Sequence, residues 1–449
     1  MMRRSKKGTV VVSMALSTVL LAACGAGGRD DKASEDGGSA GSTTGVTDTT
    51  VKIGAHYPLT GVAAPGYSEI PSGAKAYFDY VNSKGGIHGR KIQYVVKDDG
   101  YIPTNTTQAV NELVQKDQVF AVVGGLGTPT HSAVVDFLNS EKVPDLFVSS
   151  GSIKWGDDPK KRPMTFGWQP DYEIEGKIIG KYIKEKMPNA KIGLYLQDDD
   201  LGADGAKGLK QFAGGQVVKE VKYTTGNTDV APQIAALQAS KADLIVGFNV
   251  PSYTALSQLT AMKLNYKPKW FYTNVGSDPK LVGELLAKFS KGSVKNGSSA
   301  LDGIMTTEYI PGVDSADDPW VKLWQKVWKE SGGKGELTNY RIYGMSQAYA
   351  FVSALQASGK KLTREGIIKA IEQNGAKWKG PQKLPFRYSA DSHLGISGVE
   401  VVEIQNGIGK GLQSPMVTDL GDAAIKPDAG TAAQAPNASG LPDDIKATE

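Results

Sequence analysis

The sequence predicts an α/β fold with two doubly wound parallel-sheet lobes, and two observations lead to this prediction. Short apolar runs alternate with helical segments between Val51 and Leu286. Repeated strand–helix–strand units form parallel sheets that helices cover on both faces. The alternation then stops, and three helical segments follow one another before two short strands. These late extra helices indicate two lobes between which the backbone passes more than once.

The individual elements follow from apolar spacing and from glycine stops. Residues 51–56 have the pattern of a strand, and 66–83 that of a helix, because apolar side chains recur at helical spacing. Gly85-Gly86 ends this helix, since glycine adopts the left-handed conformation that closes helices. The further strands expected are 91–97, 119–123, 145–148, 190–196, 216–223, 243–248, 269–273, 384–388 and 399–404. The further helices expected are 104–116, 130–139, 173–186, 206–213, 231–239, 254–262, 280–286, 320–330, 340–357 and 363–373.

The start of the chain predicts export and a lipid anchor. Basic residues within the first seven positions precede an apolar run over 10–23, which is the order of a secretory signal peptide. A helix needs roughly 20 residues to span the ~30 Å of hydrocarbon, so this run is too short. Cys24, the only cysteine, follows Leu-Ala-Ala and resembles the cysteine of a bacterial lipobox. We therefore expect residues 1–23 to be a signal peptide and Cys24 to carry lipid on the extracytoplasmic face of a membrane.

Composition predicts a tether before the globular body and a disordered tail after it. Residues 24–50 and 416–449 are rich in small and polar residues and offer little to bury. The chain carries 51 Lys and Arg against 47 Asp and Glu, and the basic residues of the signal account for the excess. This neutral balance argues against a nucleic-acid partner. With its single cysteine used for lipid, the chain forms no internal disulfide.

Three segments carry a family resemblance. Residues 57–61 are Tyr-Pro-Leu-Thr-Gly, and 82–91 are Asn-Ser-Lys-Gly-Gly-Ile-His-Gly-Arg-Lys, followed by Asp98-Asp99 at a strand end. The third segment, 122–128, is Val-Val-Gly-Gly-Leu-Gly-Thr. Together they resemble the periplasmic binding proteins of the leucine/isoleucine/valine type, the substrate-binding components of ABC transporters. The resemblance extends over about 51–404.

The resemblance implies a type I periplasmic binding fold, in which two lobes are joined by a three-stranded hinge and ligand binds in the cleft between them. The late helices then return to complete the first lobe. The expected crossings lie near 168–171, 305–308 and 381–386, which gives lobe 1 as 51–169 plus 307–382 and lobe 2 as 170–306 plus 383–415.

The glycine-rich segment 124–130 is the expected site for a ligand carboxylate. Thr128 suits an N-cap position, and the free N–H groups at a helix start favour an anion. The resemblance implies contacts from Gly127 and the Thr128 hydroxyl, from the backbone of Ser150 and from the hydroxyl of Ser152. The alternative is that Thr128 only caps its helix and the serines only satisfy their own loop. Gly127 also stands where relatives can have a disulfide cysteine, so we expect a more mobile loop.

The second lobe contributes Leu201, Ser252, Tyr253 and Asn274, each just after an expected strand. Leu201 falls where the family often has an aromatic residue over the ligand. Asn274 falls near the position where branched-chain amino-acid binders place a carboxylate against the ligand's ammonium group, and a neutral amide cannot form that ion pair. Asp199 or Asp200 is a possible substitute. The aspartates 198–200 could also cap the next helix or hold a metal, but no further metal-ligand spacing accompanies them.

The residue set gives little support for catalysis. The sequence has no Gly-x-Ser-x-Gly elbow, and its glycine loop lacks the ending of a phosphate-binding loop. The four histidines, His56, His88, His131 and His393, are interpreted as structural or surface groups. We therefore expect no catalytic residue, no metal and no cofactor.

The expected function is that of a monomeric, lipid-anchored substrate-binding protein of an ABC importer. It would capture a small carboxylate and deliver it to a membrane permease. The candidate solutes are branched-chain or other apolar amino acids, aromatic acids and small amides. One alternative is a ligand sensor of the same fold that feeds a signalling receptor. Another is an extracytoplasmic hydrolase, which the absence of a nucleophile–base pair disfavours.

Overall fold

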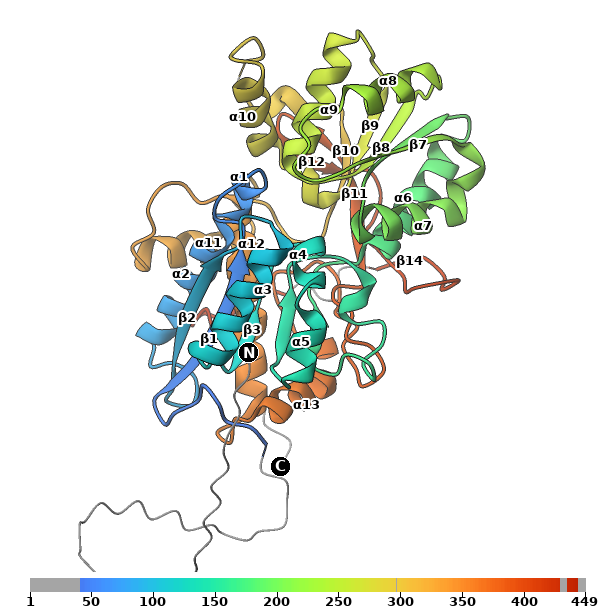
Figure 1. The fold of residues 1–449 in the computed structure, drawn as a ribbon. Coiled ribbons are helices and arrows are strands. Elements are labelled where there is room, and N and C mark those ends of the chain that lie inside the picture. Colours follow the sequence, from blue (N-terminus) through green and yellow to red (C-terminus); the bar gives the residue numbers. More distant parts are fainter. Residues whose placement is uncertain (1–40, 296, 429–433, 443–449) are drawn as a thin grey trace, which may run out of the picture. The chain divides into compact units, whose positions relative to one another are not determined.

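The computed structural model describes residues 41–295, 297–428 and 434–442, and it confirms the predicted α/β class with parallel sheets (Figure 1). The predicted signal peptide, Cys24 and the tether up to residue 40 lie outside the described residues. One sheet has five strands in the order β2-β1-β3-β4-β5. The other follows the order β14-β13-β11-β10-β9-β8-β6-β7, with β12 beside β11. We call the parts built on these two sheets lobe 1 and lobe 2.

Lobe 1 contains a wholly parallel sheet and helices from both ends of the chain. Its strands are β1 (Thr50–Tyr57), β2 (Lys91–Asp98), β3 (Ala121–Val123), β4 (Asp145–Val148) and β5 (Thr165–Gly167). Its helices are α1 (Ala64–Tyr67), α2 (Ile70–Ser83), α3 (Pro103–Asn111), α4 (Thr128–Ser132), α5 (Val135–Ser140), α11 (Pro319–Glu330), α12 (Asn339–Ser358) and α13 (Arg364–Asn374). In Figure 1 the late helices α11 and α12 return beside the early α2, as the sequence predicts.

Lobe 2 combines a parallel part with antiparallel strands from the end of the chain. Its strands are β6 (Ile192–Gln197), β7 (Val217–Tyr223), β8 (Leu244–Phe248), β9 (Lys269–Tyr272), β10 (Met305–Glu308), β11 (Gly398–Gln405), β12 (Ile408–Gly411), β13 (Met416–Val417) and β14 (Lys426–Pro427). Its helices are α6 (Tyr172–Lys186), α7 (Asp200–Ala213), α8 (Ala231–Ala239), α9 (Pro251–Lys263) and α10 (Pro279–Phe289). β11 pairs antiparallel with β10, β12 and β13. Over the part of the chain that the structure describes, no helix has the length and apolar content needed to cross a membrane.

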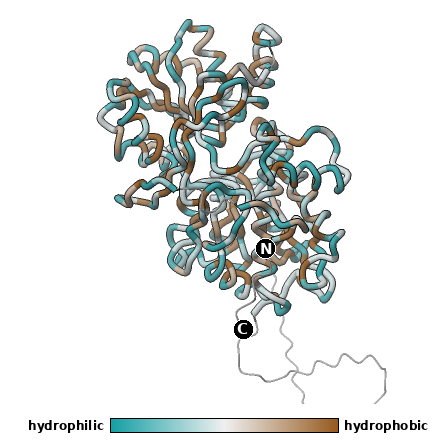
Figure 2. The backbone as a smooth tube through the Cα atoms, turned by 180° about the vertical axis from the view of Figure 1, so that it is seen from behind, coloured by the Kyte–Doolittle hydropathy of each residue, from teal (hydrophilic) through white to brown (hydrophobic). Residues whose placement is uncertain are grey.

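Each lobe has its own apolar core, and glycines allow its helices to approach closely. Buried side chains of β1, β3 and β4 pack with α2 and α12, and those of β6, β8 and β9 pack with α6 and α7. In Figure 2 brown segments run through the interior of each lobe and the outer turns are mostly teal. A Cβ atom at Gly176, Gly180 or Gly208 would overlap the backbone of the facing helix in the α6–α7 pair. This contact fixes α6, whose first residue lines the site described below.

Aspartates define the first turns of the two lobe 2 helices that face the cleft. The Asp171 side chain accepts a hydrogen bond from Ile174 N (3.0 Å) at the start of α6. The Asp199 side chain accepts one from Leu201 N (2.9 Å) at the start of α7. Side-chain oxygens at this position satisfy N–H groups that have no partner within the helix. The capping role expected for the aspartates 198–200 is therefore confirmed for Asp199.

The third passage between the lobes differs from the predicted one. The chain leaves lobe 1 between β5 and α6 and returns to it after β10, near the expected positions. The final passage, expected near 381–386, occurs after Ile396, which pairs with Phe386 in an isolated bridge. Phe386 and Tyr388 stack at 4.8 Å and are buried in the lobe 1 core. These apolar rings keep residues 384–396 with lobe 1, so the segment assigned to lobe 2 begins too early in the prediction.

Both segments predicted as disordered contain residues that pack on the lobes. Near the start, Arg364 N donates to Ser42 O (2.9 Å) and Lys52 N to Gly45 O (2.8 Å). Near the end, the Lys177 ammonium donates to Thr418 Oγ1 and to the carbonyls of 419, 421 and 423. Tyr77 OH donates to Gly440 O (2.9 Å). Apart from Thr418 Oγ1, the two segments contribute backbone groups to these contacts, which explains why composition did not reveal them.

Candidate functional site

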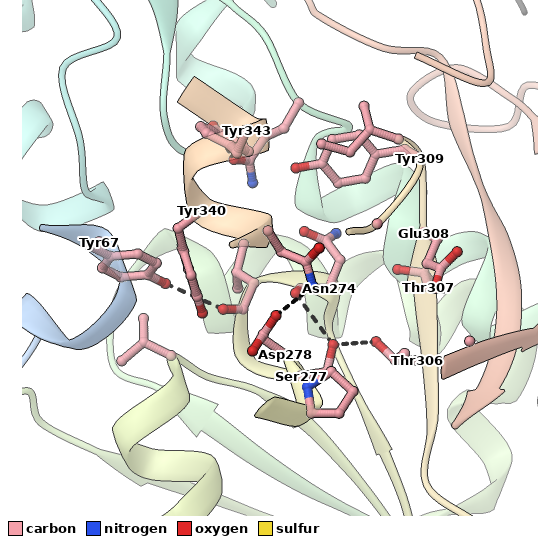
Figure 3. A pocket seen from close by; sticks show the side chains of 18 of the residues that line it. Tyr67, Asn274, Ser277, Asp278, Thr306, Thr307, Glu308, Tyr309, Tyr340 and Tyr343 are labelled. Atoms are coloured by element: carbon pink, nitrogen blue, oxygen red, sulfur yellow. Dashed lines mark hydrogen bonds between the residues drawn. The ribbon is translucent and has the colours of Figure 1, made fainter. Parts of the chain in front are cut away.

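A cavity of about 200 Å³ is lined by residues of both lobes (Figure 3). In lobe 1 its wall includes the residues that follow β3 and β4, and in lobe 2 those that follow β8 and β9. Ligands of open parallel sheets bind at the carboxyl ends of the strands, and each of these loops lies at such an end. The cavity is therefore the candidate site of the molecule.

Three hydroxyl groups meet at the lobe 1 wall. Thr128 Oγ1 lies 2.8 Å from Ser150 Oγ and 3.2 Å from Tyr172 OH, and the two partners lie 3.4 Å apart. Thr128 and Tyr172 line the cavity, and Ser150 supports them from behind. Burial raises the pKa of Tyr172 to about 12, so its hydroxyl keeps its proton at neutral pH. A hydroxyl can rotate to donate to a ligand oxygen, and this cluster therefore offers neutral donors to an anionic group.

Thr128 does not cap its helix, which removes the alternative interpretation of this residue. α4 begins at Thr128 itself, with Gly127 as the N-cap at φ 109°. The Thr128 side chain makes no capping hydrogen bond, and Thr130 Oγ1 donates to Leu126 O (2.7 Å) instead. Because α4 has only five residues, its dipole adds little, and the hydroxyl cluster is the main group at this wall that an anion could contact.

Tyrosine rings form much of the remaining wall. Besides Tyr172, the lining tyrosines are Tyr67, Tyr101, Tyr309, Tyr340 and Tyr343. Tyr67 and Tyr340 meet edge to face at 5.8 Å, and Tyr67 OH donates to Val275 O in lobe 2 (3.4 Å). Within the described ranges, the lining residues include no Lys, Arg or His. The cavity thus offers aromatic surface and neutral hydroxyls to a ligand, without a protein cation.

A buried carboxylate arranges the polar part of the lobe 2 wall. Glu175 on α6 accepts hydrogen bonds from Thr273 Oγ1 (2.6 Å), Asn274 N (2.9 Å) and Thr307 Oγ1 (2.5 Å). Burial raises the pKa of Glu175. Asn274 and Thr307 line the cavity, whereas Glu175 lies behind them. Glu175 therefore holds the ends of β9 and β10 in register at the site.

Asp278 is the lining carboxylate closest in sequence to Asn274. Its Oδ1 accepts from Leu281 N (2.7 Å) at the start of α10, and its Oδ2 accepts from Asn339 Nδ2 (2.7 Å) in lobe 1. Burial raises the pKa of this carboxyl. Among the described residues, Asp278 forms no ion pair within 4 Å, whereas the lining Glu308 pairs with Lys383 (3.1 Å).

The structure brings together only part of the predicted site. Gly127, Thr128, Leu201 and Asn274 line the cavity, but Ser150, Ser152, Ser252 and Tyr253 do not. Ser152 Oγ donates to Asp200 Oδ2 (3.1 Å), and Ser252 Oγ to Val62 O (2.9 Å). Tyr253 stacks on Tyr223 at 3.9 Å, and its hydroxyl accepts from Gly226 N (2.7 Å). These residues follow the right strands, but their side chains turn toward loops or the core.

The sequence did not indicate the tyrosine wall or the role of Glu175. The tyrosines come from segments far apart in the chain, so no local motif unites them. Asp199 and Asp200, the expected substitutes for an ammonium partner, do not line the cavity. Asp200 pairs instead with Lys154 (2.7 Å) across the lobes. In the described part of the chain, no cluster of three or more His, Cys, Asp or Glu could hold a metal ion.

Asp204 makes a further contact across the lobes, and it predicts a pH dependence. Its Oδ2 accepts from Ile153 N (3.2 Å), and burial, with Asp200 nearby, raises its pKa to about 7. The unfolded value is near 3.9, so the folded protein binds this proton more tightly than the unfolded chain. The tighter binding of this proton stabilises the folded state. This contribution to the free energy of unfolding is complete below about pH 4 and is lost as the pH rises toward 7.

We therefore expect Asp204→Asn to reduce the pH dependence of the melting temperature. Between pH 4 and 7 the native protein should lose stability relative to the variant, and above pH 7 the difference should stay constant. Thermal unfolding of both proteins across this range measures the effect. Parallel profiles from pH 4 to 7 would show that Asp204 does not titrate in this window.

The molecule thus has two α/β lobes and a cavity that residues of both lobes line. The periplasmic binding protein family model matches residues 50–409. The chain belongs to this family, as the sequence resemblance predicts.

Individual proteins show the extent of the similarity. An amino acid binding protein of Pseudomonas aeruginosa is 26% identical over 198 residues, which cover 43% of this chain and 52% of that relative. The match thus spans only about half of that relative. A Leu/Ile/Val-binding protein homolog of Brucella suis is 25% identical over 65% of this chain and 74% of its own. The structure of a fatty acid ABC transporter substrate-binding protein from Thermomonospora curvata has a TM-score of 0.71. It is 24% identical, covers 84% of this chain and 95% of its own, and shows the shared fold.

Proposed function

We propose that this protein is the extracytoplasmic solute-binding component of an ABC importer, anchored by lipid on Cys24. It captures a small carboxylate between its lobes and presents it to a membrane permease. The observation that carries this proposal is the cluster of Thr128, Ser150 and Tyr172 hydroxyls at a cavity lined by both lobes. Amino acids and fatty acids, which the names of the similar proteins give as their ligands, are carboxylates, and this supports a carboxylate as ligand.

Closure follows from differential affinity. A ligand that touches Thr128 in lobe 1 and Asn274 in lobe 2 makes its full set of contacts only when the lobes meet. Such a ligand shifts the population toward the closed form by the difference between its affinities for the two forms. The hydrogen bonds from Ser252 to Val62 and from Asn339 to Asp278 join the lobes around the cavity and add to the closed state.

The wall composition narrows the ligand class. The tyrosine rings favour an apolar or aromatic body, and the hydroxyl cluster favours a carboxylate at one end. Asn274 cannot pair with an ammonium group, but Asp278 lines the same cavity and can accept one. The candidates are therefore branched-chain or other apolar amino acids, aromatic acids and short fatty acids.

A thermal-shift screen of the purified protein tests this proposal. The compounds are these carboxylates, each paired with the amide of the same hydrocarbon skeleton. A ligand at 100 times its dissociation constant adds ~2.7 kcal/mol of stability, which raises the melting temperature by several degrees. We expect carboxylates to shift the melting temperature and their amides to do so much less. The proposal fails if no carboxylate acts, or if the amides act equally.

The anchor has a separate test, because its failure leaves the binding site intact. Cells that express the native chain are grown with labelled palmitate, and the Cys24→Ser variant serves as control. We expect label on the native protein alone, together with release of the variant from the membrane fraction. Equal retention of both proteins would exclude the anchor.

A further inference from the structure

Four buried titratable side chains lie beneath the lobe 1 wall, and the proposed function does not use them. His56 Nδ1 lies 2.8 Å from Asp99 Oδ2, and His56 Nε2 lies 3.0 Å from His131 Nδ1. His131 Nε2 in turn lies 2.9 Å from Asp145 Oδ2. All four residues have no exposed surface. We call this unbroken series, Asp99–His56–His131–Asp145, the histidine chain.

The three contacts fix the number of protons in the histidine chain. Each contact joins two atoms that carry lone pairs, so each needs one hydrogen to be attractive. Two neutral imidazole rings supply only two hydrogens. The third hydrogen is carried either by a second nitrogen of one ring or by one carboxyl, and in both cases the set has a net charge of −1. An imidazole nitrogen is more basic than a carboxylate, which favours one imidazolium beside two carboxylates.

The surroundings of the two rings favour His131 as the holder of the third proton. Burial lowers the pKa of His56, which leaves that ring neutral with its hydrogen directed at Asp99. His131 then donates from both nitrogens, to His56 and to Asp145. The other groups in contact are neutral: Thr106 Oγ1 donates to Asp99 (3.0 Å), Thr165 Oγ1 donates to Asp145 (2.9 Å), and Trp155 lies edge-on to His131. The backbone N–H of Tyr101 also donates to Asp99 (2.8 Å).

The histidine chain supports the loop that carries the ligand-binding hydroxyl. His131 and Thr128 belong to the same short helix, α4, so the position of one ring sets that of the other side chain. Gly125 passes directly over the contact between the rings, since a Cβ there would lie 2.6 Å from His56 Nε2 and 2.8 Å from His131 Nδ1. Asp99 follows β2 and Asp145 begins β4, so the series ties α4 to strands on both sides of β1 and β3.

We propose that the histidine chain acts as one unit that keeps His131 as an imidazolium at neutral and mildly basic pH, and that this unit positions Thr128 for ligand binding. Only the second half of this proposal, the positioning of Thr128, rests on the proposed function. An isolated histidine, with a pKa near 6.5, is largely neutral at pH 8. An imidazolium on His131 at pH 8 therefore distinguishes this arrangement from two ordinary buried histidines.

Nitrogen-15 NMR of the histidine rings tests the first half without any ligand. The variants His88→Gln and His393→Gln assign the other two rings. At pH 8 we expect three protonated ring nitrogens on His56 and His131 together, two of them on His131. Two protonated nitrogens, one on each ring, would overturn the proposal. Since the native protein gives this answer, the test does not depend on whether any chain variant folds.

The second half is tested with Asp145→Asn, and the exposed Asp391→Asn is the matched control. We expect Asp145→Asn to return His131 to one protonated nitrogen at pH 8. We also expect Asp145→Asn to weaken about tenfold the binding of the carboxylate that the thermal-shift screen identifies. A tenfold loss corresponds to one lost hydrogen bond to a charged group. The control should change neither. A variant whose His131 is neutral but whose affinity equals that of the native protein would exclude the positioning role. If the screen finds no ligand, the proposed function fails while the NMR result still stands.

Discussion

The double variant Thr128→Val, Ser150→Ala should bind the carboxylate that the thermal-shift screen identifies at least a hundredfold more weakly than the native protein. Each substitution removes a hydroxyl from the cluster at the lobe 1 wall. A hydrogen bond to a charged group contributes roughly 1.5–3 kcal/mol, and each 1.4 kcal/mol is a factor of ten in affinity. Because no lysine, arginine or histidine lines the cavity within the described residues, no protein cation compensates for the loss. Isothermal titration calorimetry with the ligand found by the screen measures the effect.

Tyr253→Phe is the matched control for this experiment. The sequence prediction includes Tyr253 in the site, whereas the structure directs its hydroxyl to Gly226 N, away from the cavity. We expect its affinity to lie within about twofold of the native value, since both hydrogen bonds of this hydroxyl, to Gly226 N and Thr224 O, lie outside the site. If Tyr253→Phe weakens binding as much as the double variant does, the cavity is not the binding site.

Gly208→Ala should lower the free energy of unfolding by about 3 kcal/mol, the upper end of the range for overpacking a tight interface. A Cβ atom at this position would overlap the carbonyl oxygen of Glu173 on α6, so the two helices must separate. Alanine gains up to about 1 kcal/mol over glycine in helix propensity, which works in the opposite direction. The loss of packing is larger because α6 and α7 are buried against each other along their length.

Urea denaturation of the Gly208→Ala variant measures this loss. Gly215→Ala is the control, because a Cβ there meets no atom within 4 Å. We expect the control to unfold at nearly the native urea concentration. Equal midpoints for Gly208→Ala and the native protein would show that α6 and α7 tolerate a wider spacing.

Most of the fold was predictable from sequence because its longer elements have local signals, whereas the short strands β5, β12, β13 and β14 were not predicted. Alternating apolar runs marked the strands, and glycine pairs marked the helix ends. The final passage between the lobes was not predictable. The segment that contains Phe386 and Tyr388 has no local signal that assigns it to one lobe. Tyr388 contacts Phe147 and Phe166 in lobe 1, and Phe386 stacks on Tyr388, so tertiary contacts decide the place of both rings.

The position of the site along the chain was predictable, but the directions of its side chains were not. A glycine loop after a strand located Thr128, and strand ends located Asn274 and Leu201. Ser152 and Tyr253 also follow strands, yet a rotation of a few bonds directs them elsewhere. The tyrosine wall and the histidine chain join residues from many elements. Such sets depend on tertiary packing, which no spacing along the chain encodes.

The absence of cationic side chains from the described cavity wall has a consequence for ionic strength. Attraction between separated charges is screened over about 8 Å in physiological salt. Hydrogen bonds from buried, neutral hydroxyls act at contact and are hardly screened. The affinity of this cavity for its ligand should therefore stay nearly constant between dilute medium and seawater-like salt. A protein exposed to the outside of a cell would then collect its solute whatever the salinity of its surroundings.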